Sequence, residues 1–272
     1  MLIRPAAAAG TFYPASPVAL NEQLDQLLAQ YRSEAISNSA PAEVLPPKCL
    51  IVPHAGYVYS GPTAALAYNA LADGAQAIDR VVLLGLSHRV FFRGIATSSA
   101  QKFATPLGDI ELDRASLAPL IEEGCITEND SAHEEEHSLE VQLPFLQRLL
   151  GSFKLIPLAT GECETQDVAA LLARLWGSNN TLVVVSSDLS HFHPYQQAQS
   201  IDQQTCTEIL RLYSRLTPEQ ACGCRGINGL LHQLQKAQYR IELIDYRNSG
   251  DTAGDKNRVV GYGAFAIYAN QR

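Results

Sequence analysis

The chain has 272 residues, of which 46% are hydrophobic and 18% charged, and its formal net charge is −8. This balance excludes a disordered chain, and it argues against nucleic acid as the main partner because binding a phosphate backbone needs a basic surface. No run approaches the roughly 18 apolar residues of a membrane span, and no signal-peptide core is recognisable. We therefore expect a cytoplasmic protein with no membrane partner, whose six scattered cysteines are free thiols.

Apolar periodicity and turn residues predict alternating strands and helices along the chain. In the first half the sequence predicts a helix over 16–31, a loop over 33–47, a strand over 49–52, a helix opened by Pro62 and running to 71, a strand over 81–86, a short strand within 90–98, a turn over 105–109 and a helix over 114–123. In the second half it predicts a helix over 138–150 that Pro144 either kinks or begins, a strand over 154–158, a helix over 166–176, a strand over 182–185, a helix over 201–213, a glycine-rich turn over 223–229, a helix over 230–236 and strands over 239–246 and 259–268. We expect a single α/β domain over residues 1–272, with a central, mostly parallel sheet flanked by helices.

Three of the predicted strands are continuous apolar runs, and a histidine follows each of them. Cys49–Val52 leads to His54, Val81–Leu86 leads to His88, and Leu182–Val185 leads through Ser186, Ser187 and Asp188 to His191. Strands buried on both faces read as such runs, and open α/β sheets place ligands at the carboxyl ends of their strands. If the three strands are neighbours, His54, His88 and His191 converge at one edge of the sheet.

Imidazoles from separate strands are suitable ligands for a first-row transition metal, and two of them with one anionic ligand leave positions open for substrate. Asp188 and His191 could supply a ligand and a partner that fixes the tautomer of a neighbouring imidazole. We expect the ring nitrogens of the three histidines to lie close enough to share an ion or a water molecule. Taken one at a time, each histidine could equally serve to cap a turn.

The segment from His133 to His137 matches the zinc-protease pattern HExxH. That pattern works on a helix, where both imidazoles share one face. Here three consecutive glutamates intervene, and the apolar helical period begins only after His137, so the segment predicts an exposed acidic loop entering a helix. We expect His133 to be exposed or in a loop, and His137 to point into the pocket at the strand ends.

Cys222 and Cys224 flank Gly223 in a glycine-rich stretch. The pair could ligate a metal or simply pack in a tight turn, and nothing in the sequence places a histidine beside either sulfur as a cysteine nucleophile would need. His193 and His232 have no assigned role.

Several motifs in order along the chain resemble those of the Memo family, which is known in animals as mediators of ErbB2-driven cell motility. The matching stretches are Arg4-Pro5-Ala6 with Ala9-Gly10-Thr11-Phe12-Tyr13-Pro14, Val52-Pro53-His54-Ala55-Gly56-Tyr57, Gly85-Leu86-Ser87-His88, Glu136-His137-Ser138-Leu139-Glu140, Gln142-Leu143-Pro144-Phe145, Ser186-Ser187-Asp188-Leu189-Ser190-His191 and Cys222-Gly223. The resemblance implies a fold similar to class III extradiol dioxygenases. It also implies a pocket that binds iron or copper, lined by His54, His88, His191 and Cys222, with Asp188 and His137 nearby.

The dioxygenases hold iron with two histidines and a glutamate, whereas the resemblance places Cys222 near the third position. A thiolate favours softer metals such as Cu(I) over ring-cleaving iron. Three hypotheses follow. The first is a metal-dependent oxidoreductase using iron or copper, in which His191, Asp188 and His137 act as acid, base or supporting groups. The second is a non-catalytic metal-binding or adaptor protein whose strand-end pocket takes a small molecule or peptide. The third is a zinc hydrolase with a water-activating carboxylate.

Overall fold

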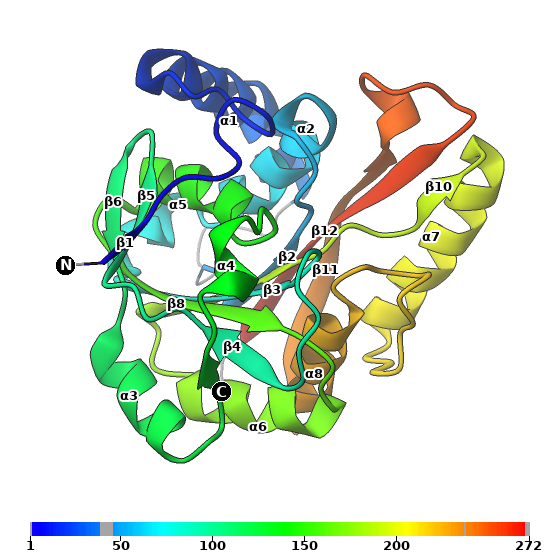
Figure 1. The fold of residues 1–272 in the computed structure, drawn as a ribbon. Helices are drawn as coiled ribbons and strands as arrows, with labels where there is room; N and C mark the ends of the chain where they lie inside the picture. The colour runs from blue at the N-terminus through cyan, green and yellow to red at the C-terminus, as the bar shows by residue number, and fades with distance from the viewer. Residues whose placement is uncertain (1, 39–45, 237, 270–272) are drawn as a thin grey trace.

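The computed structural model describes residues 2–38, 46–236 and 238–269 (Figure 1). A nine-stranded sheet forms its centre, with the strand order β10-β12-β2-β9-β3-β8-β4-β7 and with β11 paired to β12. The strands of this sheet are β2 (Cys49–Val52), β3 (Arg80–Leu86), β4 (Ile95–Thr97), β7 (Thr127–Glu128), β8 (Lys154–Thr160), β9 (Thr181–Ser186), β10 (His191–His193), β11 (Tyr239–Asn248) and β12 (Val259–Ala269). The predicted α/β fold, a central sheet flanked by helices, is confirmed. The prediction that this sheet is mostly parallel was wrong, because among the described residues four of its strand pairings are parallel and four are antiparallel.

The four strands at the middle of the sheet, β2, β9, β3 and β8, pair in parallel. All four residues of β2 and all six of β9 are buried, which explains why both read as unbroken apolar runs. Towards the margins, β12 joins β2 and β4 joins β8 in antiparallel pairs. Parallel pairing is thus concentrated in the part of the sheet that carries the predicted strand-end histidines.

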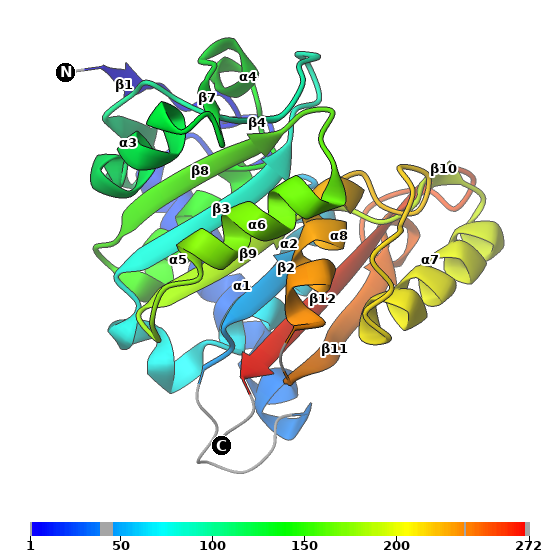
Figure 2. The ribbon, with the colours of Figure 1, turned by 90° about the horizontal axis from the view of Figure 1, so that it is seen from below.

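Helices cover both faces of the sheet (Figure 2). One face carries α1 (Pro17–Asn38), α2 (Tyr57–Asn69) and α5 (Leu143–Leu150), and the other carries α6 (Thr165–Leu175) and α8 (Cys224–Leu234), while α7 (Tyr195–Leu210) packs against β11 and β12. The remaining elements are α3 (Arg114–Glu122), the four-residue α4 (Ser131–Glu134), the 3₁₀ turns Ala72–Ala77, Glu140–Gln142 and Ser249–Asp251, and a small sheet of β1 (Ile3–Arg4), β5 (Lys102–Thr105) and β6 (Gly108–Glu111). The predicted turn at 105–109 joins β5 to β6, where Gly108 has a φ of +118°.

Several predicted boundaries were wrong. Helix α1 continues to Asn38, so residues 33–38 of the predicted 33–47 loop are helical. Residues 39–45 of that predicted loop lie outside the described residues. Helix α2 begins at Tyr57 and holds Pro62 inside it, while Pro144 lies in the first turn of α5 and so marks a helix start.

The predicted glycine-rich turn at 223–229 is mostly helical, because α8 begins at Cys224. A Cβ at Gly229 would lie 2.3 Å from Cγ1 of Val168 in α6. Gly229 therefore serves the close approach of two helices and not a turn of the chain.

Among the described residues, no helix combines the length and the apolar character needed to cross a membrane. All six cysteines lie within the described residues and none forms a disulfide, as predicted.

Candidate metal centre

The order of the central strands brings His54 and His88 together. Strand β9 lies between β2 and β3, with Ser186 paired to Val52 and Val185 paired to Leu84, so the three carboxyl ends are level. Because neighbouring strands are about 4.8 Å apart, β2 and β3 are separated by roughly 10 Å across β9. The two imidazoles bridge that gap over the end of β9, and their ring centroids are 5.2 Å apart.

His54 is buried, and two groups on β9 and the loop after it fix its position. Its backbone N–H donates to Oδ1 of Asp188 at 2.7 Å, and its Nδ1 lies 3.0 Å from Oγ of Ser186. The Ser186 hydroxyl donates its single proton to the carbonyl of Ser138 at 2.6 Å, so His54 Nδ1 must be the donor in its contact with Ser186. His54 Nε2 is left with a lone pair that faces the sulfur of Cys222.

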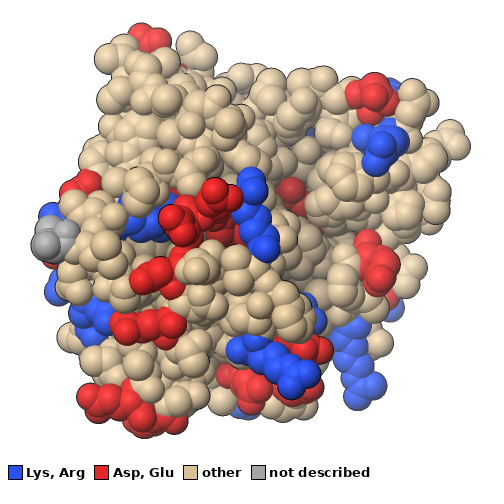
Figure 3. Space-filling view, in the orientation of Figure 1, with Lys and Arg blue, Asp and Glu red and all other residues tan. Residues whose placement is uncertain are grey.

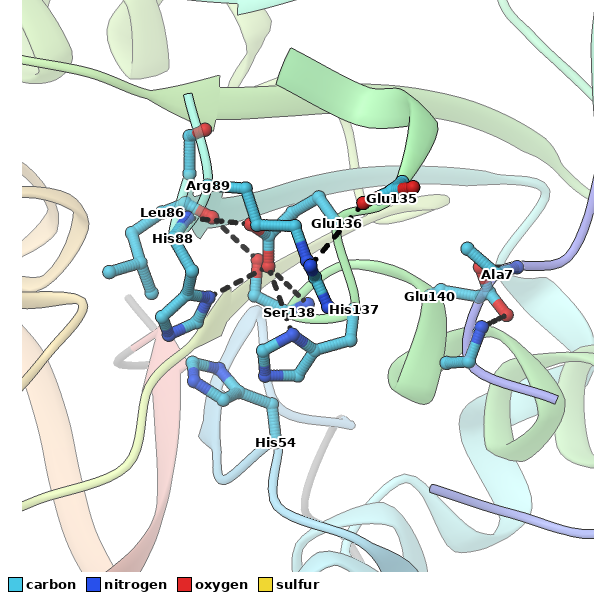
Figure 4. Close-up of polar contacts among 12 residues, drawn as sticks. Ala7, His54, Leu86, His88, Arg89, Glu135, Glu136, His137, Ser138 and Glu140 are labelled. Atoms are coloured by element: carbon cyan, nitrogen blue, oxygen red, sulfur yellow. Dashed lines mark hydrogen bonds and ion pairs between the residues drawn. The ribbon is translucent and has the colours of Figure 1, made fainter. Parts of the chain in front are cut away.

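The carboxylate of Glu136 orients His88 (Figure 4). Oε1 of Glu136 accepts from Nδ1 of His88 at 2.8 Å, and Oε2 accepts from the His88 backbone N–H at 2.6 Å. Burial raises the pKa of the Glu136 carboxyl, but the donors of His88 and Ser138 outweigh it and hold that pKa at about 2, below its usual 4.5. Because an ionised carboxylate can only accept, Nδ1 of His88 carries the proton and Nε2 is free to bind a metal.

Cys222 approaches the two histidines from the turn that precedes α8. Its Sγ lies 3.3 Å from Nε2 of His54, and its backbone N–H donates to the carbonyl of Asp188 at 3.2 Å. At Gly223 a Cβ would lie 2.7 Å from the carbonyl oxygen of Ser186 and 2.7 Å from Cβ of Ser187. The φ of Gly223 is an ordinary −86°, so the glycine is needed for space and not for its conformation.

These three side chains form a donor set that fits a transition metal. One donor atom each from His54, His88 and Cys222 lies within 4.8 Å of the other two. Two imidazole lone pairs with fixed tautomers and one sulfur match the ligand types that iron, copper and zinc accept, with coordination positions left over. Burial raises the pKa of the Cys222 thiol, and a bound cation would be needed to hold it as thiolate.

A second group of possible donors, His88, Glu136 and His137, overlaps the first. The Glu136 carboxylate already accepts from the side chain and backbone of His88, and from the backbone of Ser138 at 2.8 Å. A metal bound there would have to displace these donors. We therefore assign Glu136 the role of orienting His88 and take the first group as the candidate metal centre.

His137 points into the site, as predicted, and lies between two other rings. It stacks on His88 with ring centroids 4.5 Å apart and on Phe12 with centroids 4.3 Å apart. Its Nδ1 is 3.5 Å from Oε1 of Glu136. Burial, followed by the neighbouring His88, lowers the pKa of His137 to about 4, so this imidazole is neutral at pH 7.

Asp188 and His191 lie at the border of the site. Asp188 is buried and holds the backbone N–H groups of His54 and Ala55; burial raises the pKa of its carboxyl to about 7 although these donors lower it. His191 was predicted at the C-terminal end of a strand, but it comes after the end of β9 at Ser186 and is the first residue of β10, which pairs with β12. Its Nδ1 lies 2.8 Å from the carbonyl of Leu189, and among the described residues it belongs to neither donor group. A ligand role for His191 stays a prediction.

The HExxH segment does not form a zinc-protease site. Helix α4 ends at Glu134, so His133 and His137 do not share a helix face. The prediction that His133 is exposed or in a loop was wrong: it lies in α4, is 1% exposed, and its Nε2 lies 3.2 Å from the carbonyl of Ala96. The predicted exposure of the acidic loop was also wrong for Glu136, which lies in the loop after α4 but is buried.

Replacing Glu136 with glutamine should lower the affinity for the bound metal about 10- to 100-fold, the usual cost of losing a group that orients a ligating histidine. The amide offers one acceptor where the carboxylate offers two, and its NH₂ would face a donor of His88. Competition with a chromophoric chelator for Fe(II) or Cu(I) measures this affinity.

Glu135→Gln is the matched control, because the Glu135 side chain is 72% exposed and, within the described part of the chain, its one ion pair is with Arg89 at 3.3 Å. The control should bind metal like the wild type. Equal affinities for all three proteins would show that Glu136 does not orient a ligand.

The sequence contained Glu136, Ser186, Phe12 and Glu140 within its motifs but did not assign them a role. Glu136, Glu140 and Ser186 lie in motifs that contain a candidate histidine, which was the one available signal, whereas the motif around Phe12 contains none. The contact between Cys222 and His54, which are 168 positions apart, had no signal in the spacing of residues at all.

The fold and the site together define an α/β protein with a cluster of histidines and a cysteine at the carboxyl edge of its parallel strands. The family model described as Memo-like protein matches residues 4–266, and on that basis the chain belongs to the Memo-like family. Relatives named MEMO1 family protein occur in Aquifex aeolicus, with 34% identity over 96% of this chain and 98% of the relative, and in Sulfolobus acidocaldarius, with 35% identity over 96% and 98%.

Among solved structures, the uncharacterized protein JW3007 from Escherichia coli K12 aligns over 79% of this chain and 98% of its own. Its 14% identity and TM-score of 0.45 are too low to support an argument.

Proposed function

We propose that this protein is a metal-dependent oxidoreductase that holds iron or copper with His54, His88 and Cys222. The observation that carries the proposal is the convergence of two imidazoles, each with its Nδ1 proton engaged elsewhere, on one sulfur. Bound iron or copper would supply one-electron redox chemistry. The thiolate favours copper as Cu(I), and the imidazoles suit either metal.

The rest of the site supports this centre in distinct ways. Ser186 and Glu136 fix the tautomers of the two histidines, and Asp188 holds the backbone of His54. His137 is a neutral imidazole beside the donor set, able to accept a proton from a substrate or return one to it. The carboxylates of Glu136 and Asp188 are committed to N–H donors, which makes a water-activating role in a zinc hydrolase the weaker hypothesis.

The alternative is a non-catalytic metal-binding or adaptor protein whose strand-end pocket takes a small molecule or a peptide. Exposed apolar side chains close in sequence to the site residues favour it: Val58 after His54, Phe91 after His88 and Phe192 after His191. Nucleic acid is not part of either proposal, since the net charge is −8 and acidic and basic side chains are interspersed on the face shown in Figure 3. A cytoplasmic location, where thiols stay reduced, is part of both.

Metal analysis of protein purified without oxygen tests the proposal, combined with assays for turnover of a catechol-like substrate and for metal-dependent formation of reactive oxygen species. We expect a stoichiometric amount of iron or copper and activity in at least one assay. Metal without activity would favour the adaptor alternative. Failure to bind either metal, as purified or after addition, would overturn the assignment of the centre.

A further inference from the structure

The N-terminal segment, residues 4–13, is tied to the segment that carries Glu136 and His137. Arg4 is buried, and its Nε donates to the carbonyl of His133 at 2.6 Å. Its Nη2 donates to the carbonyl of Glu136 at 2.7 Å, and its Nη1 donates to Oε2 of Glu140 at 2.5 Å. One guanidinium thus holds three positions along 133–140.

The side chain of Glu140 binds other groups of the N-terminal segment as well. Its fully buried carboxylate accepts from the backbone N–H groups of Ala7 and Ala8, each at 2.8 Å, and from the hydroxyl of Tyr13 at 2.5 Å. With Arg4 included, each of the two carboxylate oxygens accepts from two donors. A buried charge that is paired and fully hydrogen-bonded in this way defines a single arrangement of the groups around it.

Phe12, just before Tyr13, is thereby placed over the site. Its carbonyl accepts the N–H of Tyr57, the first residue of α2, at 2.8 Å, and its ring stacks on His137 at an interplanar angle of 23°. The other face of His137 stacks on His88 at 19°. The three rings form a continuous stack in which only His88 contributes to the donor set.

We infer that the N-terminal segment is a component of the metal centre and that Phe12 is a positioning residue, which holds His137 against His88 and so restricts the orientation of the His88 ring. This inference rests on the proposed function, because its consequence is a change in metal binding. Glu136 fixes one edge of the His88 ring through Nδ1, and the stack fixes the tilt that a hydrogen bond at one edge leaves free.

The test replaces Phe12 with leucine, which keeps an apolar side chain but removes the aromatic face. We expect affinity for Cu(I), measured by chelator competition, to fall about 2- to 13-fold, the range of one lost aromatic pair. Phe12→Trp restores an aromatic face and should bind like the wild type. Tyr213→Leu is the control, because Tyr213 is 47% exposed and in none of these contacts, and it should leave the affinity for Cu(I) unchanged.

The visible spectrum of the Co(II)-substituted protein supplies a readout of geometry. The ligand-field bands should shift in Phe12→Leu and should have their wild-type positions in Phe12→Trp. A loss of general stability would not shift these bands. Unchanged affinity and spectrum in a folded Phe12→Leu protein would overturn the inference, while the metal centre itself would stand. A wild-type protein that binds no metal would instead overturn the proposed function.

A measurement without metal covers the case in which Phe12→Leu is unstable. In proton NMR of the metal-free wild type, the ring currents of Phe12 and His88 should shield the carbon-bound ring protons of His137. Unshielded His137 protons would show that the stack does not form, and would overturn the inference without any variant.

Discussion

Replacing Cys222 with serine should lower the affinity for copper or iron by at least about 100-fold, since loss of a group outside the ligand set already costs 10- to 100-fold. The Cys222 sulfur lies 3.3 Å from Nε2 of His54 and belongs to the candidate donor set. A serine hydroxyl is a poor ligand for Cu(I) and does not become an anion near neutral pH. Chelator competition under reducing conditions measures the loss.

Cys224→Ser is the control for this prediction. Cys224 begins α8, is packed in the hydrophobic core, and among the described residues is in neither donor group. Its replacement should cost some stability but little metal affinity. Equal losses from the two variants would indicate a site with two thiols, and no loss from either would leave the histidines and Asp188 as the ligands.

Acidification should destabilise the metal-free protein between pH 6.5 and 4, because buried imidazoles resist protonation. Burial lowers the pKa of His133 from 6.5 to about 4. The unfolded chain takes up this proton below pH 6.5 and the folded chain does so only near pH 4, so the free energy of unfolding falls with pH across that window. For His133 alone the loss at pH 5 is about 2 kcal/mol. His54 and His137, whose pKa values are also lowered by burial, add to this loss, whereas Asp188, whose pKa burial raises to about 7, opposes it.

Urea unfolding of the metal-free protein at pH 7.5 and pH 5 measures this difference. His133→Phe keeps a ring beside Phe103, whose centroid is 5.8 Å from that of His133, and removes the titrating group. The variant should lose about 2 kcal/mol of the pH dependence. If the free energy of unfolding changes by the same amount between pH 7.5 and pH 5 in the variant and the wild type, His133 does not remain neutral in the folded protein.

The sequence by itself determined the central strands and the residues at their ends. Cys49–Val52, Val81–Leu86 and Leu182–Val185 are apolar because both faces of the sheet are covered, and such runs can be recognised in the sequence alone. The family motifs likewise named His54, His88 and Cys222 as candidates. These features depend only on the local order of residues, and therefore the sequence is enough to find them.

The tertiary structure decided which of these residues meet. That β9 lies between β2 and β3, and so lets two histidines face each other over Ser186, follows from the order of strands in the sheet. Contacts between residues more than 40 positions apart determine the roles of Glu136, Phe12 and the pair Arg4 and Glu140. His133 is buried because α4 packs it beside Phe103, although its neighbours in the sequence are acidic. Spacing and periodicity report local geometry alone, whereas burial and ligand geometry depend on distant segments, so the sequence indicated the kind of site and the fold determined its members.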